Sequence, residues 1–154
     1  MTDWIDEEVE RIRQTADDKR RQAELEKALD GHGRNLYEDV KWAVEKAIEK
    51  INATPEIMKK LGDPLQYTGI YTSHFEVKKR TFPSVQLTVT SQGRELKVER
   101  IIYPDVRSSK GKQEREYLRA ELDNDGKPFL RSEGGEVLGV HDAAGYLLRP
   151  LLNY

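Results

Sequence analysis

Apolar residues within the first thirty positions recur at helical spacing, although sixteen of those thirty residues are charged. The spacings of four, three and four residues place the apolar positions on one narrow stripe of an amphipathic helix. Lys19 interrupts this stripe, and the apolar pattern then changes phase at Leu25. A stripe of this kind needs a covering surface, so we predict an interaction site. We call it the N-terminal stripe; it consists of Ile5, Val9, Ile12 and Ala16.

Two glycines near position 32 predict the end of this first helix. The segment Gly31-His32-Gly33 favours a C-cap and a hinge. Residues 34–52 then carry a broader apolar face, which is typical of a helix that packs on a core. Thr54 followed by Pro55 predicts the N-terminus of a short helix that ends near Leu61.

The hydrophobic period changes to two after residue 66, which predicts half-buried antiparallel strands. Two short segments, 91–93 and 123–126, carry the Gly, Asn and Asp residues of hairpin turns. We prefer a hairpin over a calcium loop that would begin at Glu121, because Ser132 stands where such a loop has its bidentate Glu. The expected strands cover residues 67–77, 84–90, 94–103, 115–122 and 127–131.

A last apolar pattern, from Val137 to Leu151, predicts a C-terminal helix that Pro150 ends. The sequence therefore predicts an α+β fold with N-terminal helices, an antiparallel meander sheet of four to five strands, and a C-terminal helix packed on one face. We expect residues 1–30 to form a charged helical extension and residues 31–154 to form a single α+β domain.

Composition narrows the possible functions. A net charge of −2 removes the general electrostatic argument for nucleic-acid binding. The absence of cysteine excludes disulfides, thiolate metal sites and cysteine nucleophiles. The first residues are acidic and lack an apolar signal region, and no apolar run approaches the roughly 20 residues that span a bilayer. We therefore expect a cytoplasmic protein without membrane contact.

The histidines are the main candidates for chemistry. His74 and Glu76 share one strand face, where they form either an acid–base pair or an ordinary surface pair, and the surface pair is our preferred interpretation. His141 lies near the apolar side of the C-terminal helix, which predicts a buried, hydrogen-bonded side chain. No nucleophile elbow, phosphate loop or metal-ligand spacing occurs. We expect no catalytic residue, no metal and no cofactor, and we favour a non-enzymatic protein.

Tyrosines and basic clusters offer weaker candidates. Four tyrosines could line a pocket between the sheet and the helices, with Tyr71 and His74 as its ligand-binding residues; packing in the core is the alternative. Two basic clusters at strand ends are best interpreted as a solvated rim. The tyrosines are Tyr67, Tyr71, Tyr103 and Tyr117, and the clusters are Lys78-Lys79-Arg80 and Arg107 with Lys110 and Lys112.

Several short motifs together resemble a family of short bacterial proteins of unknown function. They are Trp4-Ile5-Asp6-Glu7-Glu8, Phe75-Glu76-Val77, Pro83-Ser84-Val85-Gln86-Leu87 and the ending 146–152. The resemblance covers nearly the whole chain and implies no activity.

The leading functional hypothesis is a protein-interaction module that self-associates, or binds another protein, through the N-terminal stripe. Self-association is the simpler assumption, because most soluble oligomers are homomeric. The alternative is a small-ligand-binding protein that uses Tyr71 and His74.

Overall fold

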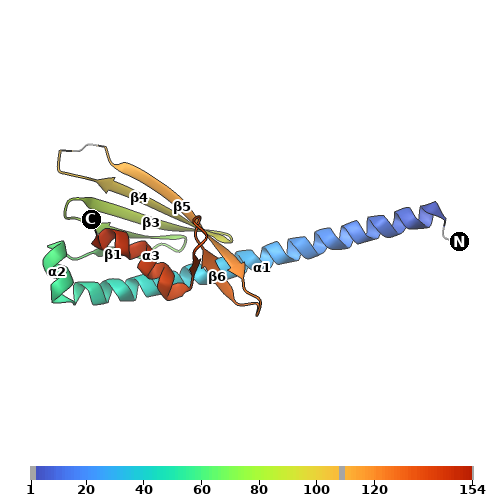
Figure 1. Ribbon diagram of the computed structural model, residues 1–154, viewed down its shortest axis with the longest axis horizontal. Coiled ribbons are helices and arrows are strands. Elements are labelled where there is room, and N and C mark those ends of the chain that lie inside the picture. Colours follow the sequence, from blue (N-terminus) through green and yellow to red (C-terminus); the bar gives the residue numbers. More distant parts are fainter. Residues whose placement is uncertain (1–2, 108–109, 154) are drawn as a thin grey trace.

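The computed structural model describes residues 3–107 and 110–153, which form one long helix, a curled antiparallel sheet and two shorter helices (Figure 1). The α+β class and the C-terminal helix are thereby confirmed. The helices are α1 (Trp4–Asn52), α2 (Pro55–Leu61) and α3 (Val140–Leu152). The strands are β1 (Gln66–Thr68), β2 (His74–Lys79), β3 (Ser84–Gln92), β4 (Glu95–Tyr103), β5 (Lys112–Leu122), β6 (Pro128–Arg131) and β7 (Val137–Leu138).

The sheet has seven strands in sequential order, so it is a pure meander, but it has more strands than the four to five expected. The segment 67–77 is a hairpin and not one strand, because β1 turns back and pairs Tyr67 with Val77 of β2. The period of two continued through the turn residues and concealed this reversal. Val137 belongs to β7, which pairs with β6, and Pro150 lies within the last turn of α3.

The predicted hinge near residue 32 is wrong, because α1 runs without interruption through Gly31 and Gly33. Gly33 permits a close approach. A Cβ atom at this position would lie 2.2 Å from the carbonyl oxygen of Gly93, in the turn between β3 and β4. A Cβ atom at Gly31 would meet nothing within 4 Å. Gly33 therefore lets the hairpin rest on the helix backbone.

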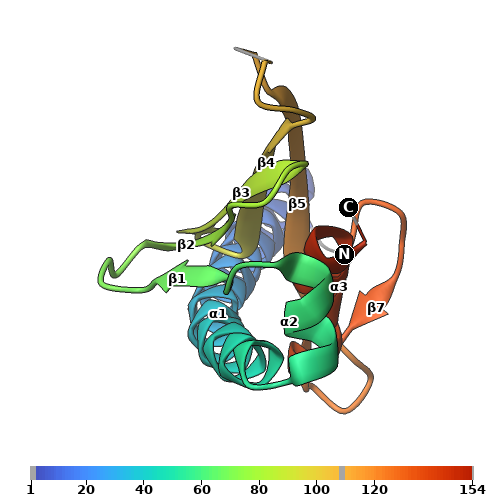
Figure 2. The same cartoon turned by 90° about the vertical axis from the view of Figure 1, so that its left-hand side faces the viewer.

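The core lies between the concave face of the sheet and the helices. The second half of α1 and all of α3 lie side by side beneath this face, and α2 closes one end (Figure 2). Strands β2 to β4 alternate buried and partly exposed residues, as the period of two predicts. The largest fully buried side chains include Tyr37, Phe75, Leu87, Leu96, Leu118 and Leu147.

The predicted turn at 123–126 is confirmed. The carboxylate oxygen Oδ1 of Asp123 accepts hydrogen bonds from the backbone amides of Asp125 and Lys127, at 2.9 and 2.8 Å. Gly126 has a φ of 78°, which glycine adopts without strain. Thr54 precedes α2 as predicted, but its hydroxyl donates to the carbonyl oxygen of Lys50 and does not cap α2.

Candidate functional site

The N-terminal half of α1 projects from the domain as a single exposed helix (Figure 1). Among described residues 3–32 no side chain is buried; the first buried residue of α1 is Gly33. Ile5, Val9 and Ile12 are 51%, 40% and 65% exposed, and Ala16 is exposed as well. The structure thus brings the N-terminal stripe together on one continuous helix and leaves it uncovered by its own chain.

The N-terminal stripe and the face of α1 that packs on the domain differ in mean direction, but they overlap. At about 100° per residue, the centre of the stripe is rotated by roughly 100° from the centre of the core-facing positions, but Ile12 and Ile48 are about ten full turns apart and point in the same direction. Leu25 and Leu29 precede the core-facing residues along α1, and by the same helical period they point in the direction of those residues. The stripe is kept from the domain by distance along the continuous helix, because Ala16 lies about 26 Å before Gly33, the first buried residue of α1.

Local contacts give the projecting segment only modest support. Two ion pairs at i, i+3 spacing occur along it, Arg11 with Glu8 and Arg20 with Asp17, and all four side chains are well exposed. Pairs of this kind contribute about 0.2–0.5 kcal/mol each. Helical stability in proteins comes mainly from the packing of an apolar face, and described residues 3–28 have no buried side chain that would supply it.

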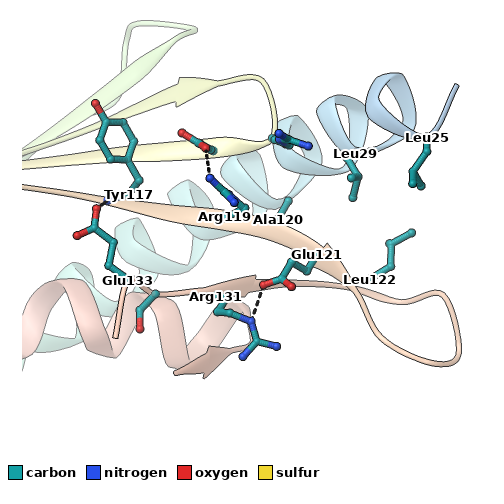
Figure 3. A pocket seen from close by; sticks show the side chains of 12 residues that line it. Leu25, Leu29, Tyr117, Arg119, Ala120, Glu121, Leu122, Arg131 and Glu133 are labelled. Atoms are coloured by element: carbon teal, nitrogen blue, oxygen red, sulfur yellow. Dashed lines mark hydrogen bonds and ion pairs between the residues drawn. The ribbon is translucent and has the colours of Figure 1, made fainter. Parts of the chain in front are cut away.

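A pocket of about 780 Å³ lies where α1 leaves the domain, and we call it the root pocket (Figure 3). Leu25 and Leu29 of α1 form one wall, and Ala120 and Leu122 of β5 contribute further apolar surface. Leu25 is 52% exposed, so the pocket opens to solvent. The sequence showed the apolar phase change at these leucines, but it could not show that the strands would face them.

Charged groups at the rim of the root pocket are largely paired with one another. Arg119 donates to the Glu95 carboxylate at 3.0 Å, and Arg131 donates to Glu121. The Glu133 carboxylate accepts the backbone amide of Tyr117 at 3.0 Å. These contacts join β4, β5 and β6, so the rim charges also tie the end of the sheet together.

Tyr71 and His74, the predicted ligand-binding residues, lie elsewhere. Their rings stack on each other, with centroids 4.3 Å apart and planes inclined by 15°. The Lys41 ammonium donates to the Tyr71 carbonyl oxygen at 2.9 Å and ties this loop to α1. The other tyrosines are dispersed: Tyr67 packs near the Phe75 ring, and Tyr117 lines the root pocket.

The remaining histidine predictions have different outcomes. The nearest atoms of His74 and Glu76, Nε2 and Oε1, are 4.0 Å apart, and both side chains are about one quarter exposed. This is a surface pair on one strand face, as preferred. The prediction that His141 is buried is wrong: it is exposed on the first turn of α3, whose apolar side points to the core through Ala144 and Leu148.

The cluster Lys78-Lys79-Arg80 does not form one basic surface. Lys78 and Arg80 are exposed, whereas Lys79 faces inward and is only 4% exposed. Its ammonium donates to the Pro83 carbonyl oxygen at 2.7 Å. Burial, together with the charge of Lys60, lowers the pKa of Lys79. The strand alternation explains the division, because neighbouring residues point to opposite faces.

A buried polar group on the concave face was not foreseen from the sequence. Arg100 is 7% exposed and donates to Glu116 at 3.4 Å, and the Tyr146 hydroxyl of α3 donates to the same carboxylate at 2.8 Å. Burial, aided by the hydrogen bond to Glu116, raises the pKa of Tyr146 to about 12. The sequence did contain one indication of this burial. Arg100 falls between Val98 and Ile102 in the alternation of the strand, which is an inward-facing position. The group joins α3 to the sheet.

Within residues 3–107 and 110–153 no group of three or more acidic or histidine side chains could hold a metal ion. None of the helices in these ranges is long and apolar enough to cross a membrane. The chain matches no protein-family model, no curated protein and no solved structure at a significant level.

Proposed function

We propose that this protein is a self-associating interaction module whose contact surface is the N-terminal stripe of α1. One observation carries the proposal: a continuous helix presents Ile5, Val9 and Ile12 to solvent in a segment that lies before the part of α1 that packs on its own domain. Burial of apolar surface stabilises association by about 25 cal/mol per Å². Four small apolar positions bury a limited area, which suits a reversible dimer better than a permanent one.

The charge pattern supports a protein partner. The projecting segment is rich in both acidic and basic residues, so it keeps a soluble surface around a narrow apolar stripe. A second copy of the same helix offers an equally narrow stripe with a charged border. Ligand binding at Tyr71 and His74 stays a prediction. It is the less favoured hypothesis, because the two rings stack on each other and leave less of their surfaces for a ligand.

The first test replaces stripe residues by aspartate. Ile5→Asp combined with Ile12→Asp places two carboxylates in the proposed contact, where burial of an unpaired charge is costly. We expect the wild-type protein to approach twice the monomer mass in light scattering as its concentration rises through the micromolar range. The double variant should stay at the monomer mass, with unchanged near-UV circular dichroism of the domain.

The matched control is Gln14→Asp combined with Arg21→Gln, which makes the same change in net charge on the side of the helix opposite the stripe. It should keep the wild-type mass profile. A wild-type protein that is monomeric at all accessible concentrations would overturn the proposal.

A further inference from the structure

The apolar stripe, followed along the uninterrupted helix, is symmetric about Gln14. Its positions continue beyond Ala16 to Lys19 and Ala23, with successive spacings of four, three, four, three and four residues. This order is the same in both directions along the chain. We call the six positions 5, 9, 12, 16, 19 and 23 the seam. An antiparallel second copy would therefore match the seam with residue i opposite residue 28 − i.

Side-chain size is complementary in this register. Ile5 would lie opposite Ala23 of the second copy, and Ile12 opposite Ala16. Each of these layers combines a large residue with a small one, which keeps the distance between the helix axes even along the seam. In a parallel pair each residue would meet its own copy, so layers of two isoleucines would lie at one end of the seam and layers of two alanines at the other.

Lys19 separates the two orientations further. In the antiparallel register it lies opposite Val9, where its aliphatic stem can cover the valine while the ammonium reaches solvent. In a parallel pair two Lys19 ammonium groups would meet inside the seam and repel each other. The residue that interrupts the stripe therefore fits one arrangement and opposes the other.

Charges beside the seam favour the same orientation. Residues 3–10 contain five acidic residues and no basic one, and residues 19–21 are all basic. Antiparallel pairing brings these two segments together at both ends, with Asp6 beside Arg20 of the second copy. Parallel pairing would pair Glu8 with Arg13 of the second copy, but it would also set the two acidic segments against each other. The antiparallel pair places Arg13 beside its own copy, at the exposed centre.

We propose that two copies of this chain pair through the projecting part of α1 as an antiparallel two-helix coil, with the two-fold axis at Gln14. This inference rests on the proposed self-association and adds its orientation and register. The part of α1 that packs on the domain begins at Gly33, about 28 Å along the helix from the axis. The two domains thus sit at opposite ends, without contact between them.

Engineered cysteines test the orientation cleanly, because the chain contains none. Ile5→Cys and Ala23→Cys chains, carrying different affinity tags, are mixed and oxidised with a glutathione buffer. We expect the mixed 5–23 disulfide to exceed either homodimer by roughly tenfold. Two copies of residue 5 would be about 27 Å apart, far beyond the Cα separation that a disulfide allows. Gln14→Cys, on the far side of the helix from the seam, measures cross-linking by random collision.

Each outcome has one consequence when the mass of the reduced proteins is measured in parallel. A dimeric mass with excess 5–5 disulfide would establish self-association and overturn the antiparallel orientation. A dimeric mass with no cross-link above the Gln14→Cys level would overturn the register. A monomeric wild-type mass would overturn the proposed function itself.

A charge exchange provides a test that leaves the seam intact. Asp6→Arg or Arg20→Asp alone turns an attraction into a repulsion at both ends of the antiparallel pair. We expect each change to raise the dissociation constant by roughly tenfold. The two changes combined in one chain should restore it to within about twofold of the wild type. Additive weakening in the combined variant would contradict the register.

Discussion

Gly33 decides how the helix and the sheet approach each other. Its missing side chain lets the turn between β3 and β4 lie directly on α1, where a Cβ atom would come within 2.2 Å of the Gly93 oxygen. From the sequence alone, the pair Gly31 and Gly33 predicted flexibility. In the structure both residues are helical, and only Gly33 has a steric requirement.

We therefore expect opposite results from two alanine substitutions two residues apart. Gly33→Ala should lower the free energy of unfolding by roughly 2–4 kcal/mol, because the hairpin or the helix must move. Gly31→Ala should raise it by up to about 1 kcal/mol, since the site is helical and open. Urea unfolding followed by circular dichroism measures both. Equal effects of the two changes would show that the hairpin does not rest on Gly33.

At the scale of elements, α1 combines two different helices in one rod. Residues from Gly33 onward pack on the core. Residues 4–28 are exposed, apart from partly covered Glu8, and are supported locally by weak ion pairs. The same backbone geometry is thus stabilised by separate causes along its length.

Hydrogen exchange should distinguish the two parts of α1. We expect amides of residues 37–51 to be protected at every protein concentration. Amides of residues 6–24 should exchange rapidly in dilute solution and become protected as the concentration rises, because pairing stabilises the helix. In the Ile5→Asp, Ile12→Asp variant they should exchange rapidly throughout. Protection of residues 6–24 that is independent of concentration would mean that the segment is a stable helix without a partner.

At the scale of the whole molecule, three tyrosines hold the layers together. Tyr37 of α1, Tyr67 of β1 and Tyr146 of α3 occupy contacts between helices and sheet. Burial is the largest cause that raises the pKa of each to about 12, and nearby negative charges add to it. The folded state therefore retains phenol protons that the unfolded chain loses near pH 10.

The free energy of unfolding should accordingly be insensitive to these groups below pH 10 and fall as the pH rises from 10 to 12. Chemical denaturation at several alkaline pH values measures this. Tyr37→Phe is an informative variant, because the Tyr37 hydroxyl is buried without a hydrogen-bond partner among the described residues. It should weaken the pH dependence without loss of stability at pH 7. If the free energy of unfolding of Tyr37→Phe falls between pH 10 and 12 as steeply as that of the wild type, a raised pKa of Tyr37 is not a cause of the pH dependence.

Much of the local structure was predictable because it follows from neighbouring residues. The α+β class, the strands from 84 to 131 and the turn at 123–126 were predicted from the hydrophobic period and from turn residues. The hairpin of β1 and β2 was missed, because its turn kept the phase of the alternation. Burial of Arg100 and exposure of His141 depend on which layer faces each residue, and no local pattern contains that information.

The sequence by itself determined the N-terminal stripe, the symmetry of its spacing and the charges beside it, since these depend only on residue order and helical period. Only the tertiary structure decided that α1 is one continuous rod, that Gly33 is a point of contact, and that the stripe stays clear of its own domain. The physical reason is packing. The sheet and α3 pack on the second half of α1, so Ile5, Val9 and Ile12 lie beyond them along the helix.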